Sequence, residues 1–354
     1  MRLVLSVIFL IFILLVVSCV KQNKPVDDPT ILYPFRQNGL LGYIDRQGNT
    51  IIEPRFNIFD PDAEEYYLTT GEDFPWLRSK FSEGVAVLGI RDENWICIDK
   101  SGKTIFEIEC SNMEPFIDGF SLVTKGDDYW FVDRSGKNVF RETYEMALSF
   151  SEGVAPVYIG DSVNYIDVKG RKIIRTDYIS GGMFIEGLAP FTDDSGMHGY
   201  IDVTGNVEIE PSYEYADYFS ETLAVVSYNR VNEGYLFIDR NGIVVIELGL
   251  KYSEVYPFRE GLAIVGKYGK YGYIDTDGEE IVEPIYEFVM PFSEGLAAVK
   301  NDSGWGFIDS RGTWVIPPRF KSAESFEDGL AWVGTDEGKG YINMEGNFIW
   351  RPEE

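Results

Sequence analysis

Carboxylate side chains recur along this sequence in two sets with a fixed spacing. The first set belongs to the motif aromatic-Gly-aromatic-Ile-Asp-x-x-Gly, which is complete at residues 271–278 and again at 305–312. Its Asp stands at Asp45, Asp99, Asp133, Asp167, Asp202, Asp239, Asp275 and Asp309, and Asn343 takes a ninth place. The second set precedes a run of small apolar residues and comprises Glu83, Asp118, Glu152, Glu186, Glu221, Glu260, Glu294 and Asp328. If the repeats close on themselves, each set forms a circle of carboxylates, and such oxygen ligands can collect Ca²⁺.

A simpler role for the first set is to support a turn. A Gly follows three residues after every one of these Asp residues. Asp can accept a hydrogen bond from the backbone two residues on, and Gly supplies the positive φ that a tight hairpin requires. We therefore predict that each Asp caps its own turn, and we expect neither a metal nor a cofactor.

Groups for nucleophilic catalysis are sparse in this sequence. His198 is the only histidine, and it stands where other repeats carry an aromatic residue such as Tyr271 or Trp305. A Ser-His or Cys-His pair would have to use it. We therefore predict that the protein is not an enzyme. With 58 acidic residues, a carboxylate-pair glycan hydrolase stays open as the alternative.

The elements that position these residues follow from a repeat of about 34 residues. Successive motif Asp positions are 54, 34, 34, 35, 37, 36, 34 and 34 residues apart. A fixed period of this size is typical of repeat architectures. Each repeat contains a GYID segment ending at the motif Asp, an apolar-pair segment such as residues 281–282, and a Gly-Leu-Ala segment such as residues 295–297.

Alternation predicts a β-strand for each of the three segments. In the GYID segment, large apolar residues occupy adjacent positions, as at Tyr273 and Ile274. Successive side chains of a strand point to opposite faces, so this strand should be covered on both sides. The apolar-pair segment often ends at a proline, such as Pro284 or Pro318, where sheet pairing should stop or reach an edge.

These segments predict an all-β protein made of three-stranded meanders in the order GYID, apolar-pair, Gly-Leu-Ala. Residues 39–354 then form one repeat domain with eight full repeats and a partial ninth. Closure into a β-propeller-like ring would remove exposed sheet edges. An open superhelical array of the same meanders is the alternative.

The repeat resembles a known family. The Trp305-Gly306 pair, the Phe-Ile-Asp that follows it and the later Gly-Leu-Ala are similar to the WG (or KWG) repeat of bacterial secreted and lipid-anchored proteins. The resemblance covers about residues 39–352 and departs at Ile96, Trp130, Asn164 and Leu236, which replace the glycine. It implies a β-rich repeat scaffold that binds a partner, with no shared catalytic activity.

The first residues of the chain have the pattern of an export signal. A positive start at Arg2 is followed by an apolar stretch that is too short to span a bilayer. Ser18-Cys19 closes it and resembles the lipobox of bacterial lipoproteins, in which the new amino-terminal Cys carries lipid. We predict a signal peptide over residues 1–18, lipidation of Cys19 and a tether over 19–38. The protein would then sit in the bacterial cell envelope, at the outer membrane or cell surface.

The charge of the chain restricts its partners. A formal net charge of −27 repels phosphate backbones, which argues against nucleic acid. It also argues against docking on anionic lipid, so the membrane would be reached through the lipid anchor alone. The partner classes that remain are a protein or a glycan, and a purely structural envelope component is a third interpretation.

An insertion in the first repeat offers one candidate binding surface. Phe56 and Phe81 are 25 residues apart, and insertions in repeat proteins map to loops that often carry the binding face. The insertion mixes acids with four aromatic residues, which are Tyr66, Tyr67, Phe74 and Trp76. We predict these four as partner contacts, with a loop that merely packs on its neighbours as the alternative.

Two cysteines replace aromatic residues within one repeat. Cys97 stands in the GYID segment and Cys110 at the end of the apolar-pair segment. If the two replaced rings are in contact, the thiols would lie side by side and could form a disulfide outside the cytoplasm. Alternatively, each is a small buried apolar residue.

Overall fold

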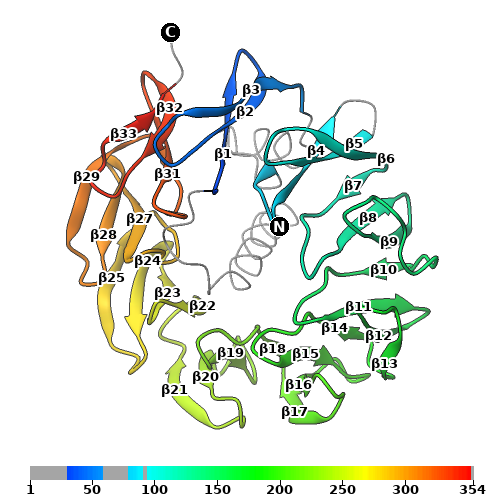
Figure 1. Ribbon diagram of the computed structural model, residues 1–354. Helices are drawn as coiled ribbons and strands as arrows, with labels where there is room; N and C mark the ends of the chain where they lie inside the picture. Colours follow the sequence, from blue (N-terminus) through cyan, green and yellow to red (C-terminus); the bar gives the residue numbers. More distant parts are fainter. Residues whose placement is uncertain (1–29, 59–78, 91–93, 352–354) are drawn as a thin grey trace. The chain divides into compact units, whose positions relative to one another are not determined.

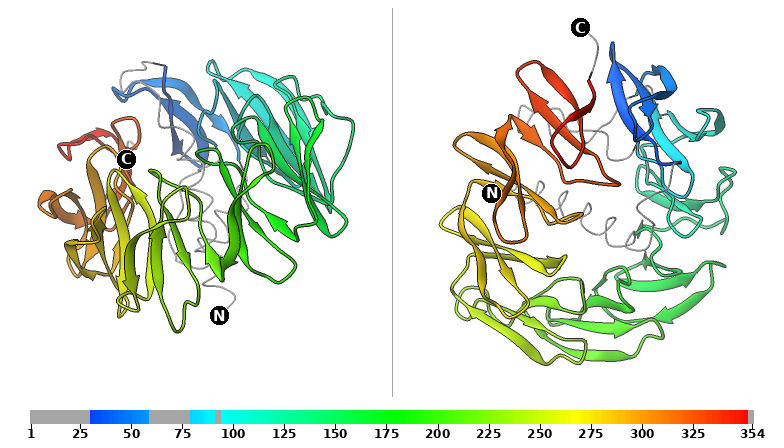
Figure 2. Two further views of the ribbon diagram at one scale, coloured as in Figure 1. Left: turned by 90° about the horizontal axis from the view of Figure 1, so that it is seen from below. Right: turned by 60° about the vertical axis from the view of Figure 1, so that its left-hand side comes forward.

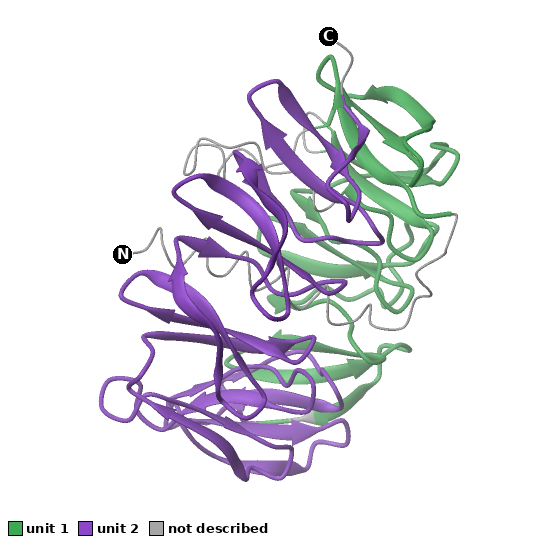
Figure 3. Ribbon diagram, turned by 90° about the vertical axis from the view of Figure 1, so that its left-hand side faces the viewer, with its two compact units in different colours: residues 1–176 green, residues 177–354 purple. Residues whose placement is uncertain are grey.

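The computed structural model describes residues 30–58, 79–90 and 94–351. The regular elements in these ranges are β-strands. None of the described residues forms a helix that is long and apolar enough to cross a membrane. The chain divides into two compact units, residues 1–176 and 177–354 (Figure 3).

The first unit contains three sheets of three strands and one of four. Its strands are β1 (Tyr33–Gln37), β2 (Leu40–Ile44), β3 (Thr50–Phe56), β4 (Val85–Ile90), β5 (Asn94–Asp99), β6 (Thr104–Glu109), β7 (Asn112–Met113), β8 (Ser121–Lys125), β9 (Asp128–Val132), β10 (Met146–Ala147), β11 (Val154–Ile159), β12 (Ser162–Asp167) and β13 (Lys172–Arg175). The sheets are β1–β3, β4–β6, β7–β9 and β10–β13, so each is built from strands that follow one another in the chain (Figure 1).

The second unit contains five sheets of four strands. Its strands are β14 (Ser180–Gly181), β15 (Leu188–Thr192), β16 (His198–Asp202), β17 (Val207–Tyr213), β18 (Tyr215–Ala216), β19 (Ala224–Ser227), β20 (Tyr235–Ile238), β21 (Val244–Gly249), β22 (Glu254–Arg259), β23 (Leu262–Lys267), β24 (Lys270–Asp275), β25 (Glu280–Tyr286), β26 (Phe288–Val289), β27 (Leu296–Asn301), β28 (Gly304–Asp309), β29 (Trp314–Phe320), β30 (Ser322–Ala323), β31 (Ala331–Thr335), β32 (Gly338–Ile342) and β33 (Phe348–Trp350). Figure 2 shows these meanders from two further sides.

Each sheet has the strand order of a β-propeller blade, with neighbouring strands antiparallel. In the sheet β26–β29, a short strand comes first, then the Gly-Leu-Ala strand β27, the GYID strand β28 and the apolar-pair strand β29. The described residues therefore contain nine blades, one for each recurrence of the motif. The predicted fold class, all-β with propeller-like meander repeats, is confirmed.

A blade does not consist of the same three strands as the repeat predicted from the sequence, because its Gly-Leu-Ala strand comes before the GYID strand and not after the apolar-pair strand. The Gly-Leu-Ala strand pairs with the GYID strand that follows it, as β23 does with β24, and not with the apolar-pair strand before it. At the amino-terminal end, β1 pairs with β2 and so supplies the Gly-Leu-Ala position of the first blade. The last blade is complete with β30–β33, so the two ends of the array do not share a sheet.

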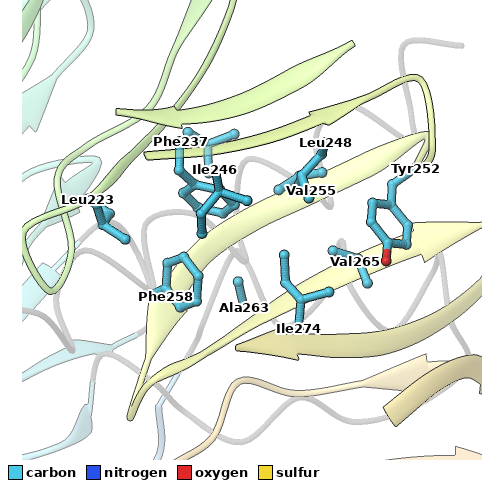
Figure 4. Packing of buried hydrophobic residues seen from close by; sticks show 11 residues of the cluster. Leu223, Phe237, Ile246, Leu248, Tyr252, Val255, Phe258, Ala263, Val265 and Ile274 are labelled. Atoms are coloured by element: carbon cyan, nitrogen blue, oxygen red, sulfur yellow. The ribbon is translucent and has the colours of Figure 1, made fainter. Parts of the chain in front are cut away.

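The GYID strands are buried on both faces, as the sequence predicts. Tyr273 and Ile274 are adjacent in β24, and both are 0% exposed. Ile274 packs into a cluster between two successive blades, where Phe237 and Ile246 from one blade lie near Phe258 from the next (Figure 4). Burying one such side chain contributes roughly 1.5–3 kcal/mol to the stability of the fold. Because the cluster draws buried side chains from both blades, packing between blades contributes to this stability.

The apolar-pair strand bulges against the GYID strand. Trp305 pairs with Phe320 and Phe307 with Ile316, so two steps along β28 match four steps along β29. Pro318 lies within the extra residues of β29. Pairing does not stop at the proline, because Trp305 pairs with Phe320 beyond it. The proline instead lies on β29, the edge strand of its sheet, which was the other expectation and suits a residue without an N–H to donate.

The glycine of the aromatic-Gly pair makes room for this bulge. A Cβ atom on Gly306 would lie 2.6 Å from the carbonyl oxygen of Ile316 and 2.7 Å from the nitrogen of Pro318. The same clash with a carbonyl oxygen, at 2.2 to 2.7 Å, would occur at Gly42, Gly199, Gly272 and Gly340. Where Ile96 replaces the glycine, it pairs regularly with Glu107 and its neighbours continue in register. The glycine is thus required where the backbones approach closely.

Candidate functional site

The motif Asp residues cap their turns. In the turn after β28, one carboxylate oxygen of Asp309 accepts hydrogen bonds from the backbone N–H groups of Arg311 at 3.0 Å and Thr313 at 2.8 Å. The same pair of bonds forms at Asp45, Asp99, Asp133, Asp167, Asp202, Asp239 and Asp275. The turn-capping prediction is confirmed.

Capping lowers the pKa of carboxylates such as Asp99 and Asp309. Hydrogen bonds from Ser101, first from its hydroxyl, and from the Lys103 N–H lower the pKa of Asp99 below its usual range. In Asp309 the N–H of Thr313 has the largest such effect on the pKa. Among the described residues, no three His, Cys, Asp or Glu side chains are grouped to hold a metal ion.

The second set of acids links one blade to the next. The Glu221 carboxylate accepts hydrogen bonds from the N–H groups of Glu260 at 2.6 Å and Gly261 at 2.8 Å, which belong to the following repeat. Equivalent bonds, of 2.7 to 3.0 Å, run from Gly119 to Glu83, Gly153 to Asp118, Glu221 and Thr222 to Glu186, Glu294 and Gly295 to Glu260, and Gly329 to Glu294. We call this contact the inter-blade clasp.

The clasp acids have an unusual backbone conformation. The six clasp acids, and Glu152 and Asp328 of the same set, have a positive φ of 51 to 56°, a backbone region that is strained for most residues other than Gly. In three clasps, a serine hydroxyl adds a bond to a Phe carbonyl of the next blade, from Ser82 to Phe116, Ser220 to Phe258 and Ser293 to Phe326, at 2.6 to 2.7 Å. The charge-assisted bonds of the clasp offset the backbone strain.

The two cysteines are buried in the same place. Cys97 and Cys110 are both 0% exposed and belong to one apolar cluster with Met113 and Phe116. Both thiols are free in the structure, and burial raises the pKa of each to about 12. They therefore behave as small apolar core residues here. The disulfide between them stays a prediction that thiol titration of the unfolded, unreduced protein can test.

Several predicted positions lie outside the described residues. Cys19 precedes residue 30, and Tyr66, Tyr67, Phe74 and Trp76 fall within 59–78. The single histidine, in contrast, lies within the described residues.

His198 is half-buried on β16, and its Nδ1 atom is 3.1 Å from the Thr192 hydroxyl. Burial lowers the pKa of its imidazole.

A group of tyrosines and acids in two successive blades is absent from the sequence-based predictions. In the blade β18–β21, the Tyr215 hydroxyl donates to the Asp217 carboxylate at 3.1 Å. In the blade β22–β25, Tyr256 and Tyr271 donate to Glu254 at 2.9 and 3.1 Å. Together with Tyr235 these residues form what we call the tyrosine–acid cluster.

Tyr235 packs beside Tyr215 and lies near enough to Tyr256 to affect its pKa. Its ring stands perpendicular to that of Tyr215, with 6.1 Å between the centroids. Burial, then Glu254, and to a smaller extent Tyr271 and Tyr235 raise the pKa of Tyr256. The pKa values of Tyr215 and Tyr271 are raised as well, so these two hydroxyls and that of Tyr256 can act as hydrogen-bond donors.

Asp217 is the most deeply placed acid of the cluster. It is 3% exposed, and burial raises its pKa to about 7, although the N–H of Tyr218, the hydroxyl of Tyr215 and the charge of Arg259 act against this rise. The backbone N–H of Tyr218 donates a hydrogen bond to Oδ1 of Asp217, with 2.6 Å between nitrogen and oxygen. Tyr200 of the preceding blade also donates to the Asp217 backbone carbonyl, at 2.6 Å.

A comparison among the repeats could have drawn attention to this cluster. Its members take three positions of the repeat. Two of these lie four and two residues before a buried Phe, as Tyr215 and Asp217 do before Phe219, and the third lies four residues before the motif Asp, as Tyr235 does before Asp239. That Phe is at most 4% exposed at Phe116, Phe150, Phe184, Phe219, Phe258, Phe292 and Phe326. The three positions around it, in contrast, change chemistry from repeat to repeat, for example Ser180, Gly182 and His198 in one blade and Phe288, Met290 and Trp305 in another.

Comparison with known proteins agrees with the repeat geometry. The family described as WG containing repeat matches residues 42–68, 97–130, 131–161, 199–230, 237–271, 271–304 and 305–338. This chain belongs to the WG-repeat family. The matched segments cover most of the blades of this WG-repeat protein. None of the curated proteins matches its sequence.

Several solved structures are similar to this chain at low sequence identity. A crystal structure of the eukaryotic initiation factor is 9% identical, covers 90% of this chain and 95% of its own, and has a TM-score of 0.60. BamB from Moraxella catarrhalis is 14% identical over 66% of this chain and 79% of its own, with a TM-score of 0.40. Hsv2 from Kluyveromyces lactis is 13% identical over 76% and 96%, also with a TM-score of 0.40. At these identities the likeness to the first structure concerns the fold alone.

Proposed function

We propose that this WG-repeat protein is a bacterial cell-envelope lipoprotein whose blades form a non-catalytic binding scaffold for a protein or glycan partner. The proposal for its location rests on the sequence, where an export signal ends at Cys19 in a lipobox-like context. Lipid on this cysteine holds the protein at the membrane without a spanning segment.

The observation that supports a scaffold is the division of labour among repeat positions. Acids that recur in every complete repeat are used within the fold, either as turn caps, like Asp309, or as inter-blade clasps, like Glu221. Residues between these fixed points vary in chemistry from blade to blade. A frame held by its own contacts, with variable positions on it, is how repeat proteins present binding surfaces.

The alternative of a carboxylate-pair hydrolase is less well supported by the described acids. A general acid needs a raised pKa and access to the scissile bond. Asp217 has a pKa raised to about 7, but it is only 3% exposed. Such a side chain cannot reach a substrate without rearrangement of the blade.

Capture by the lipid-free protein tests the scaffold. Residues 20–354 are immobilised and incubated with an envelope extract from the source cells, and the bound material is identified. We expect one protein or glycan to be retained specifically, and to be lost when residues 60–78, which carry the four insertion aromatics, are deleted. No retention above an empty matrix would contradict the scaffold, and release of shortened glycans would favour the hydrolase. Loss of folding on deletion would show that the insertion belongs to the core.

A further inference from the structure

We propose that the tyrosine–acid cluster is a binding site for a neutral oligosaccharide. This inference deepens the proposed scaffold function and rests on it, because it assigns a ligand class and a place to the partner. The cluster differs from the insertion predicted as a contact surface, since it lies on strands β18, β20, β22 and β24 and their direct continuations.

The first argument is the combination of side chains. Tyr215, Tyr235, Tyr256 and Tyr271 are each partly exposed and partly buried in the blades. A half-buried Tyr offers an apolar ring and a polar tip. The C–H faces of a sugar ring can pack on such rings, while sugar hydroxyls can bond to the Glu254 carboxylate and to tyrosine oxygens. Ligand sites commonly combine aromatic walls with a few placed polar groups in this way.

The second argument is that the polar atoms are held in place. Glu254 accepts hydrogen bonds from Tyr256 and Tyr271, and Asp217 accepts one from Tyr215. Each carboxylate oxygen has two lone pairs, so Glu254 can still accept from a ligand hydroxyl. Groups that are ordered before binding lose less conformational entropy when a ligand arrives.

The third argument concerns the charge of the ligand. Glu254 carries a carboxylate in the middle of two tyrosines, and the chain as a whole has a net charge of −27. An anionic glycan would meet repulsion from both. Arg230, which lies over the Tyr215 ring at 5.1 Å from the centroid, and Arg259, whose charge acts on Asp217, offset only part of this repulsion, because the chain as a whole is strongly acidic. A neutral sugar avoids the repulsion and still uses the carboxylate as an acceptor.

The fourth argument is the mirrored arrangement of the two blades. The short segment before the buried Phe reads Tyr-x-Asp at Tyr215 and Asp217, and Glu-x-Tyr at Glu254 and Tyr256. In both blades a tyrosine of the GYID strand, Tyr235 or Tyr271, completes the set. In another blade, the same three positions hold the apolar residues Met146, Leu148 and Val163. The fold therefore does not require tyrosines and acids at these positions, and we attribute their presence in the two successive blades to a ligand.

The test is titration calorimetry of the lipid-free protein with cellotetraose, chitotetraose and maltotetraose as neutral probes and a sialylated tetrasaccharide as the anionic comparison. We expect at least one neutral probe to bind and the anionic one to bind at least tenfold more weakly. Tyr271→Ala and Tyr235→Ala should each weaken binding at least tenfold. Tyr271→Phe, which keeps the ring and removes the hydroxyl, should give a smaller loss.

Tyr268→Ala is the matched control. Tyr268 lies in the turn between β23 and β24 of the same blade, is 92% exposed, and takes no part in the cluster. It should bind the probe as the unchanged protein does, and melting temperatures identify any variant that fails to fold.

Two results would overturn the inference. One is that no neutral probe binds at millimolar concentration, and the other is that Tyr271→Ala and Tyr235→Ala both bind normally. Either result leaves the wider scaffold proposal standing if the capture experiment retains a protein partner.

Discussion

At the scale of single residues, the described acids include some that are stabilised as carboxylates and one, Asp217, that burial stabilises as a neutral acid. Capped residues such as Asp99 and Asp309 have lowered pKa values. Their contribution to stability is present above the pKa of the unfolded chain and is lost as pH falls through the lower folded value. Asp217 behaves in the opposite way, since burial raises its pKa from 3.8 to about 7.

This difference predicts how Asp217→Asn changes the pH dependence of stability. Between pH 4 and 7 the unfolded chain has released the Asp217 proton while the folded chain still holds it, so the unchanged protein loses stability as pH rises. Each unit of pKa difference corresponds to about 1.4 kcal/mol. Asn does not titrate, so the melting temperature of the variant relative to the unchanged protein should rise from pH 5 to pH 8. A difference that is constant over this range would contradict the assignment.

At the scale of elements, the glycine of the aromatic-Gly pair should be a strict requirement. Gly306→Ala would place a Cβ atom 2.6 Å from the Ile316 carbonyl oxygen and 2.7 Å from Pro318. Because backbone atoms cannot move aside without opening the bulge, we expect a loss of more than about 3 kcal/mol in the free energy of unfolding.

The matched control for this prediction is Gly295→Ala. Gly295 has a φ of +80° and no heavy atom within 4 Å of the added Cβ, so only the backbone preference should be lost, about 1 kcal/mol. Chemical denaturation measures both variants. Equal losses in the two would show that close approach of the strands is not the reason for the aromatic-Gly pair.

The inter-blade clasp gives a second prediction at this scale. Glu221→Ala removes two charge-assisted hydrogen bonds to the next blade, and we expect the free energy of unfolding to fall by about 1–2 kcal/mol. Glu279→Ala, at an exposed site in the turn after β24, should change it by less than about 0.5 kcal/mol. Urea denaturation measures both variants. Equal losses in the free energy of unfolding would mean that Glu221 affects stability only through its charge and not through the clasp hydrogen bonds.

The elements show how far the sequence alone could go. Adjacent large apolar residues such as Tyr273 and Ile274 predicted a strand covered on both faces, and Asp-x-x-Gly predicted capped turns, because both signals are local. The grouping of strands into blades was not predicted correctly, since the sequence does not say whether a Gly-Leu-Ala strand pairs backward or forward. The clasps were missed for a related reason. Glu221 and Glu260 are 39 residues apart, and their contact exists only once two blades are stacked.

The tyrosine–acid cluster was missed because its residues look ordinary one at a time. Tyr215 and Tyr256 stand in short segments without a clear strand pattern, and their carboxylate partners are among 58 acidic residues. Three-dimensional pairing brings the positions before the buried Phe next to the GYID strand. Comparing the repeats position by position would have shown that these sites vary while Phe219 and Phe258 do not.

At the scale of the whole molecule, the proposed location depends on one residue. Cys19→Ala removes the thiol that would carry lipid, so the precursor should accumulate unprocessed or the protein should become soluble. Detergent-phase partitioning of cell fractions measures this directly. Unchanged partitioning of the variant into the detergent phase would contradict lipidation at Cys19.

The central claim is that the anchored repeat array binds a partner without altering it. Whole-cell crosslinking of the full-length protein, followed by affinity purification and mass analysis of the attached material, tests this most directly. We expect one protein or glycan species to be crosslinked reproducibly, to be recovered chemically intact, and to be reduced when the tyrosine–acid cluster or residues 60–78 are changed. Recovery of the protein alone, or of a partner that has been cleaved, would contradict the account.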